Sequence, residues 1–486
     1  MGDEGVMLPI YFCPVLSRFI LNGQMLLTFI ALYLLATIGL GLWASQRVHN
    51  TSDFALAGRK LPLFLAGSAL FATWFGSETV MGAPPIFVEE GLLGVMEDPF
   101  GAALCLFVVG WMVARPMYKL NILTFNDYYK MRYGRATEIA SALFMVPSYF
   151  GWIAAQLVAM AILLNVLAGI PISWGLVGCM IIVVIYTTVG GMWAVSITDF
   201  VQTIMILIGI VALAVTVGQQ AGGVQKVLAA QPDGFFQFFP ERTFHGWVHY
   251  IAAWITIGLG SVPGQDVFQR VMAAKDEKTA VQSSYLAGFM YLTIGFIPLF
   301  IGLCAKQLHP DLMTDDPQKL LPTMVLQYGG IGLQIVFFGA LLSAILSTTS
   351  GAVLAPATVI GENLIKPLFK KVEDHQLLAI MRLSVVGVAI ASTFIALQGA
   401  SIYELVGISS VFSLVSLFVP LMAGLYWKRA TGTGALSAMF IGMAVWVLCD
   451  MIIVTETPPL IYGLLASGLG MVGGSLLSKP ALTTEF

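Results

Sequence analysis

Charged side chains are scarce in this sequence. Only 10% of its 486 residues are Asp, Glu, Lys or Arg, while 58% are hydrophobic and the mean hydropathy is +0.88. A water-exposed surface needs more charge than this, so the composition excludes a soluble globular protein. The net charge is −3 and no basic tail is present, so nothing indicates nucleic-acid binding. The composition predicts a polytopic membrane protein whose surroundings are the lipid bilayer.

Metal-binding and catalytic motifs are also missing. The five cysteines are scattered without CxxC spacing, which indicates small buried hydrophobes rather than a disulfide or metal framework. His245 and His249 have i, i+4 spacing without a surrounding HExxH motif. We interpret the pair as the start of an interfacial helix, with a metal site as the alternative. No GxSxG motif and no plausible pair of intramembrane aspartates occurs, so we expect neither an enzyme nor a cofactor.

The apolar segments number about thirteen, each close to the ~20 residues that a membrane span requires. They lie near residues 24–44, 62–86, 98–116, 138–167, 171–189, 194–217, 246–263, 282–304, 330–358, 376–398, 402–424, 431–453 and 458–477. The N-terminus carries Asp3 and Glu4 and lacks a basic region, so we expect no cleaved signal peptide. No linker separates a second domain. The sequence therefore predicts one all-α transmembrane domain over residues 1–486.

The basic residues predict how the chain is oriented. Of the 23 lysines and arginines, eighteen fall in alternate loops, among them Arg270. The other five are Arg18, Lys226, Arg242, Lys306 and Lys319. Because cytoplasmic loops carry the excess of positive charge, we expect the N-terminus outside and the C-terminus in the cytoplasm of a plasma or inner membrane.

Two of the apolar segments are interrupted. Leu61–Pro85 contains three glycines, two adjacent prolines and the polar sequence Gly76-Ser77-Glu78-Thr79. His249–Arg270 contains three glycines and a proline near its centre. Each segment alone fits a kinked packing helix, since Gly and Pro are common in membrane helices. In hydrocarbon, however, a broken helix is tolerated only where it lines a cavity or binds a ligand.

The spacing of the two interrupted segments predicts an internal repeat. They lie five spans apart, so they cross the membrane in opposite senses. Paired broken segments in corresponding halves are the best sequence indication of a secondary transporter's midplane site. The two inverted repeats of five spans would cover about 62–217 and 246–424, with peripheral helices at 24–44, 431–453 and 458–477.

One face of the segment 330–358 is small and hydroxylic. Ala340, Ser343, Ala344, Ser347, Thr348 and Gly351 recur at helical spacing. Such a face is typical of tight helix packing. It also fits a site for a hard monovalent cation, which prefers oxygen ligands and must bind weakly enough to leave. The Ser347 and Thr348 hydroxyls would then face the unwound carbonyls of a broken helix.

Four motifs in register resemble the sodium:solute symporter family over essentially the whole chain. They are GGMWAVSITDFVQ (190–202), GQDVFQRVMAAKD (264–276), ILSTTSG (345–351) and GLYWKRATGTGA (424–435). The resemblance implies a LeuT-like fold with Na⁺ between the first broken helix and the hydroxylic helix. By position it implies carbonyl ligands from Ala72, Phe75 and Ala344 and side-chain ligands from Ser347 and Thr348. It also places Asp199 on the cytoplasmic exit path of the ion, the alternative being a helix cap or interfacial carboxylate.

Within the family, ATW at 72–74, FQRV at 268–271 and LPTMVLQY at 321–328 are similar to the high-affinity choline transporter branch. That resemblance implies that Trp74 and Trp152 enclose a quaternary ammonium by cation–π contact. The alternative is that both rings are core or interfacial aromatics. Gly264 stands where the branch has a further tryptophan, and Ala102 stands in place of a tyrosine.

Acidic residues near the predicted cavity leave a second kind of solute open. Glu78, Glu97, Asp98 and Asp266 could hold the ammonium group of a zwitterion such as an amino acid. Glu97 and Asp98 fit an outer loop equally well. The sequence thus predicts a Na⁺-coupled importer of a small organic solute that works by alternating access. The rival hypothesis is a transporter-like membrane sensor, which would bind the solute without flux in reconstituted vesicles.

Overall fold

The computed structural model describes residues 14–369, 371–453 and 455–478. All regular secondary structure in this part of the chain is helical, apart from one isolated β-bridge between Leu61 and Ala274. In the first half the α-helices are α1 (Pro14–Ser45), α2 (Thr51–Leu56), α3 (Leu63–Ala72), α4 (Ala83–Glu90), α5 (Ala102–Val108), α6 (Ala114–Lys119), α7 (Phe125–Tyr133), α8 (Arg135–Ala168), α9 (Ile172–Gln220) and α10 (Val224–Ala229).

The second half of the chain is also helical. Its α-helices are α11 (Phe244–Gly260), α12 (Gln265–Met272), α13 (Glu277–Ile294), α14 (Phe296–Leu308), α15 (Leu312–Asp315), α16 (Leu320–Tyr328), α17 (Ile331–Val359), α18 (Asp374–Ala396), α19 (Ile402–Ser413), α20 (Val419–Tyr426), α21 (Gly432–Met451) and α22 (Pro459–Leu477). Short π-helical turns connect several of them, notably η2 (Glu78–Gly82), η4 (Met96–Gly101), η7 (Ile360–Ile365) and η9 (Leu414–Phe418).

The helices are built for a bilayer. In the described part of the chain, nine helical stretches are long and apolar enough to span a membrane. Helix α9 covers two predicted spans. At 1.5 Å per residue its 49 residues would measure about 74 Å if the helix were straight, which is more than one crossing of a hydrocarbon core of about 30 Å requires. The large exposed hydrophobic side chains include Leu32, Leu35, Leu465 and Leu469 on α1 and α22. These surfaces suit lipid contact, and the chain is a multi-pass membrane protein. The number of thirteen spans stays a prediction.

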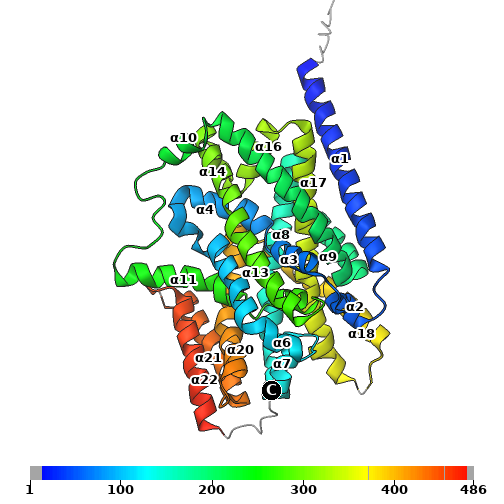
Figure 1. Cartoon of the computed structure of the whole chain (residues 1–486), viewed down its shortest axis with the longest axis vertical. Helices are drawn as coiled ribbons and strands as arrows, with labels where there is room; N and C mark the ends of the chain where they lie inside the picture. Colours follow the sequence, from blue (N-terminus) through cyan, green and yellow to red (C-terminus); the bar gives the residue numbers. More distant parts are fainter. Residues whose placement is uncertain (1–13, 370, 454, 479–486) are drawn as a thin grey trace, which may run out of the picture.

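Helix α17 lies at the centre of the packing. Every residue from Phe337 to Val359 is buried, and the helix packs against α9, α8, α1 and α18. In Figure 1, α1 stands at one edge of the molecule, while α21 and α22 form a pair at the opposite edge. These are the three helices predicted to be peripheral. The division into repeats at 62–217 and 246–424 stays a prediction.

Both predicted interruptions are present. Helix α3 ends at Ala72, the chain turns through residues 73–76, and helical structure resumes at Ser77. Helix α11 ends at Gly260, and α12 begins five residues later at Gln265. The backbone joins the two broken segments, because the Leu61 amide donates to the Ala273 carbonyl at 2.9 Å and the Lys275 amide donates to the Leu61 carbonyl at 2.9 Å. These two hydrogen bonds therefore hold the start of the first broken segment against the end of the second.

The cysteines in the described residues form no disulfide. Cys105, Cys179 and Cys304 are buried and Cys449 is half-buried, all as free thiols, which agrees with the interpretation as small hydrophobes. Cys13 lies outside the described residues, as do the acidic residues of the N-terminus.

Candidate functional site

The break in α3 lies against the hydroxylic face of α17. The Thr348 hydroxyl donates to the Ala72 carbonyl at 2.8 Å. A Cβ atom at Gly76 would lie 3.7 Å from Ile345. Phe75 lies between these contacts on the broken segment, and Ala344 precedes Ile345 on α17, both at most 3% exposed. The structure thus brings together the segments that carry all five predicted Na⁺ ligands.

The carboxylate of Asp199 lies next to Ser347, where α17 meets the break in α3. The Ser347 hydroxyl donates to Asp199 Oδ1 at 2.6 Å, and the Thr198 hydroxyl lies 3.2 Å from the same serine oxygen. Asp199 is 1% exposed, and its Oδ2 atom has no hydrogen-bond partner. A carboxylate that accepts from a ligand hydroxyl orients it and increases its basicity. An all-oxygen set with a buried carboxylate behind it fits a small hard cation.

Arg270 faces this carboxylate. Its Nη2 atom lies 4.0 Å from Asp199 Oδ2, and its Nη1 atom donates to the Asp266 carbonyl at 3.3 Å. The side chain is fully buried, and a methyl group at Gly351 of α17 would clash with it. The prediction that Arg270 lies in a loop is wrong, because α12 carries this side chain into the core. A lone arginine beside an apolar span was the available signal.

A cavity of about 430 Å³ opens beside both breaks. Its lining comes from the first broken segment, α8, the second broken segment and α19. The lining residues are Trp74, Glu78, Ser148, Tyr149, Trp152, Ile257, Gly260, Ser261, Gly264, Asp266, Val406, Ser409, Ser410 and Ser413. Five of the six predicted solute-binding residues are among them. Tyr149 and the five serines were not predicted.

The polar groups of this cavity are arranged around its aromatic rings. The rings of Tyr149 and Trp152 have centroids 5.9 Å apart, and Glu78 lines the same cavity. The Tyr149 hydroxyl donates to Asp266 Oδ1 and accepts from the Asp266 amide at 2.9 Å. The cavity therefore combines aromatic faces, two carboxylates and several hydroxyls.

Glu97, the sixth predicted residue, lines a different cavity. This second cavity, of about 1320 Å³, is also lined by Glu90, Glu241 and Tyr403; we call it the outer cavity because the sequence predicts that it faces outside. Glu97 belongs to the turn η4, which packs against α11. Asp98, which follows, is fully buried and accepts from the Thr79 hydroxyl at 2.7 Å. The outer-loop alternative for Asp98 is therefore wrong.

The histidine pair also lines the outer cavity. Nε2 of His245 and of His249 lie 2.8 and 3.0 Å from the carbonyl oxygen of Glu456. Both rings therefore hold the connection between α21 and α22 against the start of α11. Among the described residues, no group of three or more His, Cys, Asp or Glu side chains is placed to hold a metal.

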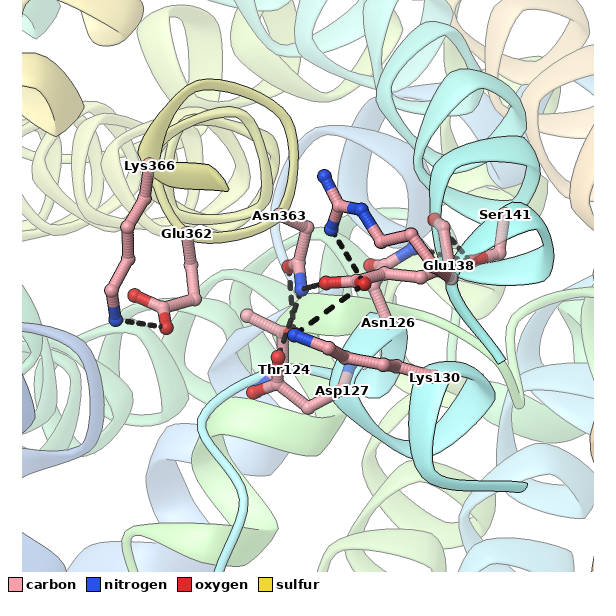
Figure 2. Close-up of polar contacts among 10 residues, drawn as sticks. Thr124, Asn126, Asp127, Lys130, Glu138, Ser141, Glu362, Asn363 and Lys366 are labelled. Carbon is pink, nitrogen blue, oxygen red and sulfur yellow. Dashed lines mark hydrogen bonds and ion pairs between the residues drawn. The ribbon is translucent and has the colours of Figure 1, made fainter. Parts of the chain in front are cut away.

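A second buried polar cluster anchors the end of α17 (Figure 2). The Asn363 amide donates to Asp127 at 2.8 Å and to Glu138 at 2.9 Å, and its oxygen accepts from the Thr124 hydroxyl at 2.8 Å. Arg135 lies 2.6 Å from the same Glu138 carboxylate. The cluster joins η7, which continues α17, to α7 and the start of α8. It fixes one end of the helix that carries Ser347 and Thr348.

Comparison with known proteins identifies the family. The model of the sodium:solute symporter family matches residues 54–442. High-affinity choline transporter 1 of Drosophila melanogaster is 28% identical over 434 residues, which are 86% of this chain and 69% of that protein. High-affinity proline transporter PutP of Bacillus subtilis is 27% identical over 440 residues, which are 84% and 89% of the two chains.

The fold agrees with that assignment. The structure of a Na⁺-coupled sialic acid symporter in a substrate-bound outward-open state superposes with a TM-score of 0.81 at 18% identity, covering 94% of this chain and 98% of the other. The fold is therefore LeuT-like, as the sequence predicts. The chain belongs to the sodium:solute symporter family and is a membrane transporter that couples the import of a small solute to Na⁺.

Proposed function

We propose that the coupling ion binds where the break in α3 crosses α17. Its ligands are the carbonyls of Ala72, Phe75 and Ala344 and the hydroxyls of Ser347 and Thr348. The observation that carries this proposal is the 2.8 Å contact from the Thr348 hydroxyl to the Ala72 carbonyl. It joins a side-chain ligand to a backbone ligand from a segment far away in sequence, so an ion there holds the two helices together.

The solute binds in the cavity lined by Trp74, Glu78, Trp152, Gly264 and Asp266. It is a small organic molecule with a positively charged nitrogen, which both sequence-predicted classes share: a zwitterion such as an amino acid, or a quaternary amine such as choline. The names of the choline and proline transporters among the relatives support this range. Glu97 in the outer cavity lies on the approach to the site.

Transport follows alternating access. Na⁺ entering from outside bridges α3 and α17 and stabilises the outward-open state, and the cavity then closes around the solute. Rocking of one helix bundle opens the inner side, where Asp199 helps the ion to leave. The membrane potential contributes about 2.3 kcal/mol per charge per 100 mV, in addition to the Na⁺ gradient.

The ion site is tested with the double variant Ser347→Ala/Thr348→Ala. Because a ligand that binds only the folded state stabilises it, Na⁺ should raise the melting temperature of the purified wild-type chain and leave that of the double variant unchanged. The matched control is Thr349→Ala/Thr358→Ala, whose hydroxyls donate to carbonyls of α17 itself at 2.5 and 2.8 Å. Equal Na⁺ responses in both double variants would place the ion elsewhere.

The orientation is part of the same proposal: the N-terminus lies outside and the C-terminus in the cytoplasm of a plasma or inner membrane. Asp233 and Lys371 are exposed in loops predicted on opposite sides. In a background without Cys13 and Cys449, an impermeant maleimide added to intact cells should label Asp233→Cys and spare Lys371→Cys. The reverse pattern would invert the proposed topology.

A further inference from the structure

The charges that line the solute cavity have one sign. Glu78 and Asp266 are its two acidic residues, and none of the described residues that line it is Lys, Arg or His. Burial of an ionised carboxylate is costly unless a partner compensates it. The two carboxylates differ in whether the protein itself provides that partner, and this difference bears on the charge of the solute.

The negative charge of Asp266 is compensated by groups of the protein itself. Its side chain folds back over the start of α12, where a Cβ atom at Gly264 would lie 2.8 Å from Oδ1. The carboxylate accepts from the Tyr149 hydroxyl, and the Arg270 guanidinium, which donates to the Asp266 carbonyl, lies nearby. The N-terminus of a broken helix is where transporters of this kind hold an anionic group of their substrate. Here the protein's own carboxylate fills that position.

Several other backbone amides at the two breaks already donate hydrogen bonds within the protein. In the second break, the amides of Ser261, Val262 and Gly264 donate to carbonyls of the preceding turn at 3.0–3.2 Å. In the first break, the amides of Trp74, Phe75 and Gly76 do the same at 2.8–3.5 Å. Among the described residues that line the cavity, a solute carboxylate would find no basic side chain.

Glu78 is left without compensation. It is 2% exposed, and its Oε2 atom has no hydrogen-bond partner. It lines the cavity together with Trp74 and the aromatic pair of α8. An ionised carboxylate accepts hydrogen bonds and cannot donate them. A cationic solute that donates an N–H would supply the missing partner and hold Glu78 in its ionised form.

The outer cavity favours the same kind of molecule. Glu90, Glu97 and Glu241 line it, and none of its described lining residues is Lys or Arg. The two histidines there are turned toward the Glu456 carbonyl. A cleft lined by charges of one sign concentrates ions of the opposite sign. The approach to the site therefore selects for cations.

We propose that the solute is a small organic cation with at least one N–H and no anionic group, bound with Glu78 as its counter-ion. Asp266 occupies the position that a solute carboxylate would take and excludes acids and zwitterions. This inference rests on the proposed function, in which this cavity is the solute site, and it narrows the range given there. The amine is primary, secondary or tertiary, because a quaternary nitrogen offers Glu78 no hydrogen bond.

The test uses the purified full-length chain in lipid nanodiscs and a matched series of probes. Ethanolamine, N-methylethanolamine, N,N-dimethylethanolamine and choline differ by one methyl group each, and only choline has no N–H. Glycine resembles ethanolamine in size and carries a carboxylate. In Na⁺ buffer, we expect the first three amines to raise the melting temperature. Choline should bind at least about tenfold more weakly than the dimethyl compound, since a hydrogen bond to a charged group is lost.

Variants at position 78 assign the effect to the carboxylate. Glu78→Gln should abolish the response to the amines, and Glu78→Asp should keep part of it. Glu89→Gln, at an exposed position, should behave like the wild type. Binding of choline as tight as that of dimethylethanolamine, binding of glycine, or silence of all the amines would each overturn the inference. Amine binding that is equal in Na⁺ and K⁺ buffer would instead count against Na⁺ coupling and leave the inference standing.

Discussion

Replacing Asp199 by Asn should weaken Na⁺ binding without removing a ligand. The Ser347 hydroxyl lies 2.6 Å from Asp199 Oδ1, and hard cations lie about 2.4 Å from their oxygen ligands. An ion on Ser347 therefore lies within about 5 Å of the carboxylate. At an effective dielectric constant of about 20, unit charges at this distance attract each other by roughly 3 kcal/mol. Arg270, 4.0 Å from the other carboxylate oxygen, offsets part of this attraction.

We therefore expect Asp199→Asn to cost about 1.4–2.8 kcal/mol of Na⁺ binding free energy, which is about ten- to hundredfold in affinity. The assay is a Na⁺ titration of the melting temperature of the purified chain, in which the midpoint should move to higher Na⁺ by that factor. The Asn oxygen still accepts from Ser347, so a loss of packing does not explain the shift. Asp233→Asn, in an exposed loop, is the charge-matched control. An unchanged midpoint for Asp199→Asn would refute the reasoning.

Two further predictions concern stability. Gly351→Ala places a methyl group against the buried guanidinium of Arg270 and should lower stability by about 1–3 kcal/mol. Gly178→Ala in α9, where nothing lies within 4 Å, should be neutral or slightly stabilising, and equal melting temperatures of the two variants would contradict the placement of Arg270. Asn363→Ala leaves the buried Glu138 with fewer partners (Figure 2) and should cost about 1–3 kcal/mol, which thermal unfolding in nanodiscs would show; an unchanged melting temperature would mean that the cluster does not anchor α17.

The elements of the site that could be predicted are those with a local signal. The glycines and prolines of 61–85 and 249–270 mark breaks because such residues weaken a helix wherever they stand. The face with Ser347 and Thr348 is visible at helical spacing. Ser409, Ser410 and Ser413 of α19 show the same i, i+1, i+4 spacing and line the cavity beside the breaks, so the spacing of hydroxyls also predicts this wall.

Other features could not be predicted, because they depend on contacts between distant segments. Tyr149 reaches Asp266 across 117 residues, and Thr348 reaches Ala72 across 276. No spacing rule connects such positions. Glu97 and Asp98 are neighbours in sequence, yet one lines the outer cavity and the other is fully buried beside Thr79. The two side chains point in different directions because Asp98, within the turn η4, leaves the helical conformation.

Arg270 connects the two halves of the site through charge. It lies between Asp199, behind the ion ligands, and Asp266, at the wall of the solute cavity, and neither carboxylate has another basic partner among the described residues. Both retain an oxygen atom without a hydrogen-bond partner, as do Nε and Nη2 of the guanidinium. Na⁺ at the proposed site beside Ser347 would offset the charge of Asp199 and leave the guanidinium more strongly attracted to Asp266. Occupancy of the proposed ion site would therefore alter the field in the proposed solute cavity, although ion and solute share no ligand. This electrostatic route would couple the two proposed sites.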